Sequence, residues 1–124
     1  MKFILEIGGK DYTFEMNRQQ YKKLLCDENY AKMQNDVSLK SDEKEDVTDI
    51  NKLMINNLLM EEKIIHYALL LNQPNITEEE TSKLVDIAYE EYGAVAVGDM
   101  ATKLIENFSR GEVETKKTMN LRMI

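Results

Sequence analysis

The fold of this chain is decided near its start, by the stretch Phe3-Ile4-Leu5-Glu6-Ile7-Gly8-Gly9-Lys10-Asp11-Tyr12-Thr13-Phe14. Apolar side chains alternate with other residues on both sides of a Gly-Gly pair, which is the period of a β-strand. Glycine accepts positive φ at both central positions of a type I′ turn, so this pair predicts a hairpin over residues 2–16. Such a turn pairs Leu5 with Tyr12 and Phe3 with Phe14, which puts the apolar side chains on one face. An isolated hairpin is marginal in water, so we expect it to pack on helices or on strands of another chain.

Four stretches with helical periodicity follow the hairpin. They cover about residues 18–33, 50–71, 77–92 and 95–109. The clearest start signal belongs to the third, because Thr77 can cap it and Glu80 can reach back to the cap; Asn17 with Gln20 is a weaker form of this pattern. The second helix is apolar most of the way round, so we expect it to be central or covered by a partner. The sequence therefore predicts a mostly helical α+β fold, with an N-terminal β-hairpin followed by about four helices.

The length and the charge limit the class of protein. A chain of 124 residues suits one hydrophobic core, so we expect a single domain over residues 1–111 and a basic-apolar tail over 112–124. The net charge is −7, and residues 27–49, with eight acidic residues against three lysines, contribute −5 of it. We expect an acidic, mobile segment at about residues 34–48. This charge argues against a protein that neutralises nucleic-acid phosphates, and no apolar run has the length of a membrane span.

Chemically reactive residues are few. The chain has one cysteine, Cys26, and one histidine, His66, which excludes an intramolecular disulfide and a zinc site built from several such ligands. No phosphate loop, catalytic triad or nucleotide fingerprint is present, so we expect no catalytic residue, no metal and no cofactor. A small enzyme that uses Cys26 with His66 as its base is one functional hypothesis, and it is weaker than the two that follow below. The eight methionines suit either a gap-filling core or an adaptable binding surface.

Three parts of the chain resemble one protein family in their layout. They are the hairpin at residues 7–14, the helix, proline and threonine-capped helix start at residues 64–80, and Tyr89-Glu90-Glu91-Tyr92-Gly93 with the closing helix that contains Phe108. Together they are similar to the tail assembly chaperones of long-tailed, siphovirus-type phages of Gram-positive bacteria. The acidic segment at residues 34–48 departs from that pattern.

The resemblance implies a non-catalytic phage or prophage protein that works in the host bacterial cytoplasm and is absent from the mature virion. Such chaperones bind and solubilise the tape measure protein while it is extended, and they help to recruit tail tube subunits. The resemblance therefore implies the tape measure protein and the tail tube protein as partners, allows self-association, and implies no contact with nucleic acid or membrane. Met-rich helices and a negative net charge suit such a temporary cover.

The expected contact residues lie on the last helix and in the tail. They are Met100, Leu104, Ile105, Phe108, Met119, Leu121 and Met123. The sequence leaves open whether the helical members of this set bind a partner or only pack on the preceding helices. The remaining hypothesis, of a different class, is an acidic phage- or plasmid-encoded inhibitor that mimics nucleic acid and carries its charge in residues 27–49.

Overall fold

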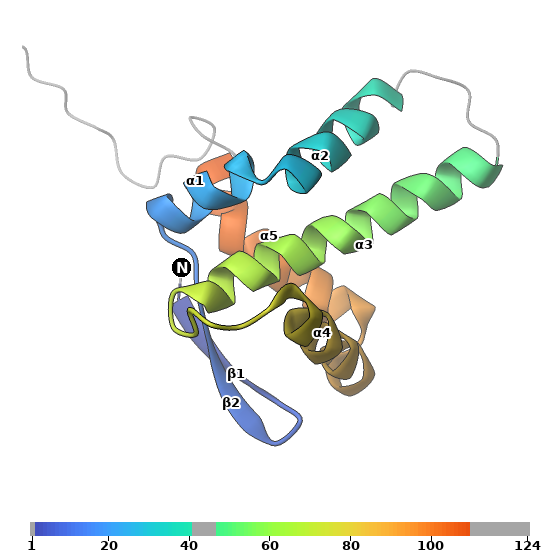
Figure 1. Ribbon diagram of the computed structural model, residues 1–124. Helices are drawn as coiled ribbons and strands as arrows, with labels where there is room; N and C mark the ends of the chain where they lie inside the picture. Colours follow the sequence, from blue (N-terminus) through green and yellow to red (C-terminus); the bar gives the residue numbers. More distant parts are fainter. Residues whose placement is uncertain (1, 41–46, 110–124) are drawn as a thin grey trace, which may run out of the picture.

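The computed structural model describes residues 2–40 and 47–109. It contains a hairpin, β1 (Lys2–Ile7) and β2 (Lys10–Glu15), followed by α1 (Arg18–Cys26), α2 (Glu28–Lys40), α3 (Val47–Leu70), α4 (Glu78–Tyr92) and α5 (Ala94–Ser109). The predicted fold class, mostly helical α+β with an N-terminal hairpin, is confirmed. Figure 1 shows α3 running across the molecule, with α1 and α2 on one side of it and the hairpin and α4 on the other.

The hairpin has the predicted register. Phe3 pairs with Phe14 and Leu5 pairs with Tyr12, and the rings of Phe3 and Phe14 stack with their centroids 5.5 Å apart. Both glycines of the turn have positive φ, 61° and 80°, as a type I′ turn requires. The strands pack on α3 and α4, so the helices supply the support that an isolated hairpin lacks.

The C-terminal half of α3 lies at the centre of the core. Ile64, Ile65, Ala68 and Leu69 are all buried, and β2, α1, α4 and α5 pack around this helix. The rest of the buried apolar core is Ile7, Phe14, Met16, Leu24, Tyr30, Leu84, Val85, Ala88, Val97, Ala101 and Leu104. The prediction of a central helix is therefore confirmed for this half.

The predicted single helix over residues 18–33 is wrong, because the chain forms two helices that meet at Asp27. Asp27 has an extended backbone (φ −68°, ψ 119°), and its N–H donates to the carbonyl oxygen of Leu24. Its carboxylate accepts a hydrogen bond from the Tyr30 N–H at 3.0 Å, which is the contact that an N-cap makes. Asp27 therefore ends α1 and starts α2, and the described residues form five helices rather than four.

Parts of the expected acidic segment are helical. α2 continues to Lys40, and α3 begins at Val47. The few apolar residues there predict a mobile segment, either a loop or a frayed helix end, because a helix without a continuous apolar stripe has little to bury. Residues 41–46, like the tail predicted at residues 112–124, lie outside the described residues.

The predicted helix starts differ in how they are completed. At α4 the capping box is confirmed, because the Glu80 N–H donates to the Thr77 hydroxyl and the Thr77 N–H donates to the Glu80 carboxylate, both at 3.1 Å. At α1 the Asn17 side chain accepts from the Gln20 N–H at 2.8 Å. The Gln20 side chain, however, donates to the carbonyl oxygen of Tyr67 at 2.6 Å. Gln20 therefore ties α1 to α3 instead of closing the cap.

Candidate protein-binding surfaces

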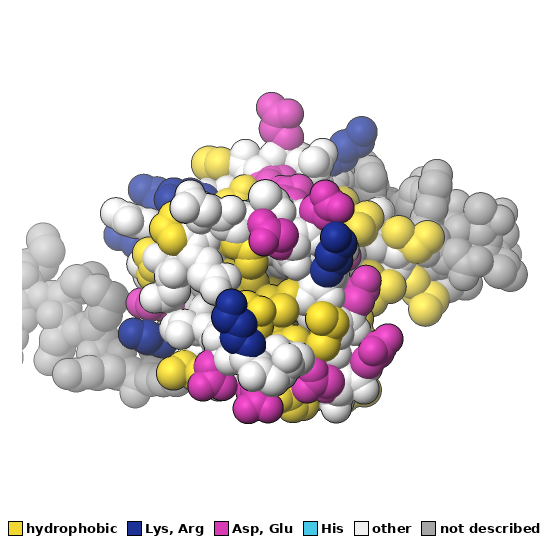
Figure 2. Space-filling view, turned by 60° about the horizontal axis from the view of Figure 1, so that its bottom comes forward, with side chains coloured by type: hydrophobic (Ala, Val, Ile, Leu, Met, Phe, Trp, Pro, Cys, Tyr) yellow, Lys and Arg dark blue, Asp and Glu magenta, His cyan; other side chains and the backbone are white. Residues whose placement is uncertain are grey.

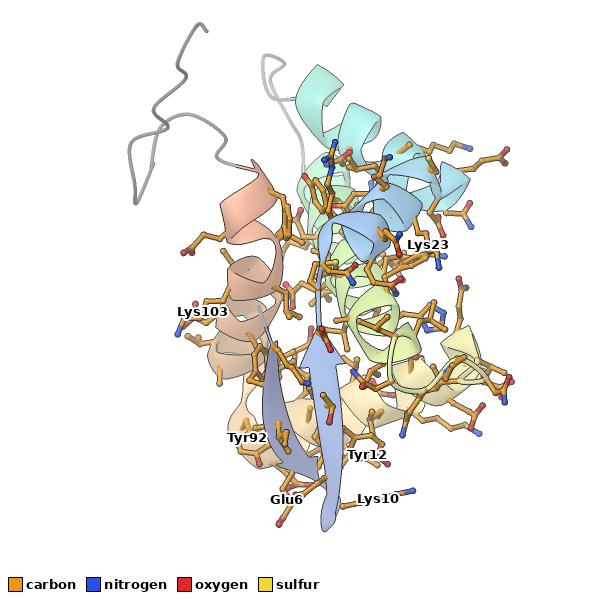
Figure 3. All side chains as sticks on the ribbon, turned by 90° about the vertical axis from the view of Figure 1, so that its left-hand side faces the viewer. Glu6, Lys10, Tyr12, Lys23, Tyr92 and Lys103 are labelled. Carbon is orange, nitrogen blue, oxygen red and sulfur yellow. The ribbon has the colours of Figure 1, made fainter. Side chains whose placement is uncertain are left out.

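An apolar groove lies between β1 and α5. Its volume is about 410 Å³, and it is lined by Phe3, Leu5, Tyr92, Ala96, Val97, Asp99, Met100 and Lys103. The Tyr92 hydroxyl donates a hydrogen bond to the carbonyl oxygen of Glu6, at the edge of β1. Figure 3 looks onto this side of the molecule, with Tyr92 beside β1 and Lys103 pointing outward from α5. The groove is therefore open to solvent between a strand edge and a helix.

The structure separates the contact residues that were predicted on the last helix. Met100 lines the groove, so its side chain reaches the surface. Leu104 is 0% exposed, so it packs within the core and offers no surface to a partner in this conformation. Ile105 and Phe108 are partly buried against the core, and the Phe108 ring stacks on Tyr21 with the centroids 5.0 Å apart. Outside the described residues lie Met119, Leu121 and Met123.

A second apolar surface, which the prediction of contact residues missed, lies on the N-terminal half of α3. Met54, Ile55, Leu58 and Leu59 are 59%, 55%, 45% and 44% exposed. Their spacing puts them on one face of the helix, and together they form the α3 stripe. The sequence carried a signal for it, because a helix that is apolar most of the way round is either central or covered by a partner.

A hollow between α2 and α3 adjoins the α3 stripe. Its volume is about 360 Å³, and it is lined by Asn29, Lys32, Met33, Asn56, Leu59, Lys63 and Glu78. Leu59 belongs to both the stripe and the hollow, so the two surfaces are continuous. Figure 1 shows α2 and α3 projecting together from the body, and Figure 2 shows hydrophobic side chains on the side toward which α3 projects. The same view has a further apolar area in the middle of the face, with acidic side chains at its rim.

A polar cluster next to this hollow joins four helices. Lys63 of α3 forms ion pairs with Asp27 at 3.1 Å and with Glu78 at 2.6 Å, and the Tyr67 hydroxyl donates to Asp27 at 2.8 Å. The side chains of Asp27 and Lys63 are only 10% and 13% exposed. The cluster therefore ties the junction of α1 and α2, and the start of α4, to α3. Asp27 is one of the eight acidic residues of the 27–49 segment, and this pairing removes it from any exposed acidic surface.

The cluster shifts the pKa values of its members. Burial alone would raise the pKa of Asp27, but hydrogen bonds from the Tyr30 N–H, the Tyr67 hydroxyl and Lys63 outweigh it and lower that pKa. Burial would lower the pKa of Lys63, but the hydrogen bonds to Glu78 and Asp27 raise it above its ordinary value. Burial and the bond to Asp27 raise the pKa of Tyr67 to about 12. These shifts keep the salt bridge ionised and the tyrosine neutral at pH 7, which is the behaviour of a structural cluster.

The single histidine is integrated into the fold. His66 is buried, and its Nδ1 lies 2.8 Å from the hydroxyl oxygen of Thr81. Because that hydroxyl donates to the Thr77 carbonyl oxygen at 3.1 Å, it accepts from a protonated Nδ1 of the ring. Burial lowers the pKa of His66, which favours a neutral ring. Cys26 is exposed on α1, and within residues 2–40 and 47–109 no contact joins it to His66.

Metal, membrane and family signals are absent from the part of the chain that the structure describes. No group of three or more His, Cys, Asp and Glu side chains there is arranged to hold a metal ion, and no helix there is long and apolar enough to cross a membrane. In comparisons with known proteins, no family model, no curated protein and no solved structure matches the chain. The groove and the α3 stripe are the apolar surfaces that the described residues present to solvent.

Proposed function

We propose that this chain is a non-catalytic tail assembly chaperone of a long-tailed phage, and that it binds helical segments of the tape measure protein through the α3 stripe. The observation that carries the proposal is the exposure of four apolar side chains on a helix whose other half is buried. The resemblance of the sequence layout to tail assembly chaperones supports the tape measure protein as the partner.

An amphipathic helix suits the stripe and the adjoining hollow. Such a ligand lays apolar residues three and four positions apart against an apolar groove, in the way that grooves of other proteins receive helices. The hollow adds a polar rim, because Asn29 and Lys32 of α2 and Asn56 of α3 line it. A tape measure protein is a long helical chain whose apolar stripe needs cover until the tail tube encloses it.

The limited size of the surface suits a temporary cover. Four exposed apolar side chains support a contact of modest strength, and differences in strength between related complexes lie mainly in the dissociation rate. Fast dissociation lets tail tube subunits displace the chaperone as the tube grows. The net charge of −7 keeps many copies soluble while they coat one extended chain.

Co-expression with the tape measure protein of the same phage tests the proposal. We expect the tagged chain to keep the tape measure protein in the soluble fraction and to co-purify with it. Leu58→Glu puts a carboxylate in the α3 stripe. We expect it to reduce co-purification by about tenfold or more, because docking would bury an unpaired charge.

Val95→Glu is the matched control for this experiment. Val95 is 79% exposed in the first turn of α5, outside the stripe, so the same kind of change there leaves docking intact. Circular dichroism checks that both variants fold. If the native chain neither binds nor solubilises the tape measure protein, the proposed function is wrong. If Leu58→Glu binds as the native chain does, the stripe is not the site.

A further inference from the structure

The outer edge of β1 carries backbone groups that point away from the hairpin. In a hairpin with a two-residue turn, the residues that flank the turn form a hydrogen-bonded pair, and such pairs alternate along the ladder. The flanking pair here is Ile7 with Lys10. Counting back from it, the residues of β1 whose N–H and C=O groups point outward are Lys2, Ile4 and Glu6. The hydrogen bond from the Tyr92 hydroxyl to the Glu6 carbonyl oxygen agrees with this direction.

This edge is exposed in the described part of the chain. No described residue bonds to the outward backbone groups of Lys2 or Ile4. The Ile4 side chain, on the solvent face of the hairpin, is 65% exposed. A free strand edge with a large apolar residue at its centre is a surface that natural proteins pair or cover.

The sequence of β1 is complementary to itself in charge. Lys2 and Glu6 lie two residues to either side of Ile4, so all three side chains share the solvent face. When a second β1 runs antiparallel with Ile4 opposite Ile4, each Lys2 lies opposite Glu6 of the other copy. Opposite charges at facing positions stabilise antiparallel strands, and like charges destabilise them. In this register the outward N–H and C=O groups of Lys2, Ile4 and Glu6 face those of the other copy. They can therefore form hydrogen bonds between the two β1 strands.

The groove beside β1 also carries one acidic and one basic side chain that could pair with a second copy. Asp99 and Lys103 lie one turn apart on α5 and both line the groove, and neither forms an ion pair with a described residue. In such a dimer the two-fold axis passes between the two Ile4 residues. The groove of each copy then faces the groove of the other. Phe3 and Leu5, which are half-buried in the single chain, would then become less accessible to solvent. Each groove would also present the acidic Asp99 and the basic Lys103 to the other copy.

We propose that a second copy of this chain docks on the outer edge of β1, antiparallel and with Ile4 opposite Ile4, so that two hairpins form one four-stranded sheet. Four strands on a helical layer are more stable than an isolated pair of strands. The Glu6 carbonyl oxygen, which already accepts from Tyr92, keeps a second lone pair for the Lys2 N–H of the other copy. The α3 stripe takes no part, so the dimer and the proposed contact with the tape measure protein can fail separately.

Light scattering on the full chain over the micromolar range tests the dimer and its register. We expect twice the monomer mass of 14.4 kDa at the higher concentrations. Lys2→Glu and Glu6→Lys each place two like-charge pairs across the axis, so each weakens dimerisation by about tenfold. The double variant Lys2→Glu/Glu6→Lys restores it to within about threefold of the native chain. Such a rescue requires that residue 2 faces residue 6 of the other copy.

A pair of proline variants tests the edge itself. Ile4→Pro removes the outward N–H at the centre of the proposed interface without removing a bond of the hairpin ladder. Thr13→Pro is the matched control, because Thr13 lies opposite Ile4 in the same pair and its N–H points out of the other edge. We expect Ile4→Pro to abolish the dimer and Thr13→Pro to keep it, with circular dichroism checking that both fold.

Three outcomes would overturn the proposal. One is a chain that is monomeric at every concentration. If the Ile4 amide hydrogen of that monomer also exchanges slowly, the chain's own residues cover the edge of β1. Another is a dimer that Leu58→Glu breaks and the charge reversals leave intact, because that dimer uses the α3 stripe. The third is equal loss of the dimer in both proline variants.

Discussion

The two halves of α3 have the same kind of sequence and opposite surroundings. In the C-terminal half, Ile65 and Leu69 are 2% and 0% exposed, whereas in the N-terminal half Ile55 and Leu58 are 55% and 45% exposed. The hairpin, α1, α4 and α5 gather around the C-terminal half in Figure 1, whereas α2 runs beside the N-terminal half. Hydrophobic periodicity therefore locates the apolar faces of a helix but does not say what covers each of them.

The boundary between the halves is the polar cluster. Lys63 lies between the exposed stripe and the buried segment, and it holds Asp27 and Glu78 at 3.1 Å and 2.6 Å. On the C-terminal side of Lys63 the helix supports the core. On the N-terminal side its apolar residues are available to a partner, so stability and binding separate along one helix.

Truncating one leucine in each half gives the largest expected contrast. Leu69→Ala empties space in the core, and we expect the free energy of unfolding to fall by about 2–5 kcal/mol. Leu58→Ala removes a side chain that is 45% exposed, and we expect a loss below about 0.5 kcal/mol. Urea unfolding followed by circular dichroism measures both. Equal losses would contradict the contrast and would mean that the stripe is covered in the isolated protein.

Removing the carboxylate at the boundary should have a smaller effect. Asp27→Ala deletes the cap of α2 and leaves Lys63 and the Tyr67 hydroxyl without that acceptor, so we expect a loss of about 1–3 kcal/mol. Asp27→Asn is the matched control, because its amide oxygen can keep the cap on the Tyr30 N–H, whereas its NH2 group cannot accept from Lys63 or the Tyr67 hydroxyl as the second carboxylate oxygen does. We expect its loss in the same urea titration to be smaller. An Asp27→Ala variant as stable as the native chain would show that the cluster does not hold the junction.

The smallest effect should appear as a dependence on acid pH. The pKa of Asp27 is lowered from 3.8 in the folded protein, so the unfolded chain binds this proton more tightly. Its contribution to stability is fully present above the unfolded pKa and is lost as the pH falls through the lower folded pKa. We therefore expect the stability difference between the native chain and Asp27→Asn to shrink as the pH is lowered below 3.8. A difference that stays constant from neutral to acid pH would contradict this assignment.

Local signals were predicted well because the residues that make them are close in the sequence. The turn, the register of the hairpin and the capping box of α4 each depend on residues within a short stretch. The break at Asp27 was missed because the apolar spacing runs past it. Its cap on the Tyr30 N–H is local, but Lys63 and Tyr67, which hold the junction against α3, are 36 and 40 residues away, and local periodicity carries no information about contacts at that separation.

The candidate surfaces were predicted only in part, for the same reason. Met100 was expected to contact a partner and does line a groove, whereas Leu104, one turn later, is fully buried. The two residues are alike in hydrophobicity, so only the neighbours brought by other elements separate them. The α3 stripe was indicated as a face in need of cover, but the sequence did not show which half of the helix the core would enclose.

By itself, the sequence determined the hairpin with its register, the mostly helical α+β class and the start of α4, because backbone sterics, capping and short-range periodicity depend on neighbouring residues. The tertiary structure alone decided which apolar faces became core and which stayed exposed, and it holds the junction at Asp27 against α3. Burial depends on the summed contacts of segments far apart in the chain, and those contacts exist only once the helices have packed.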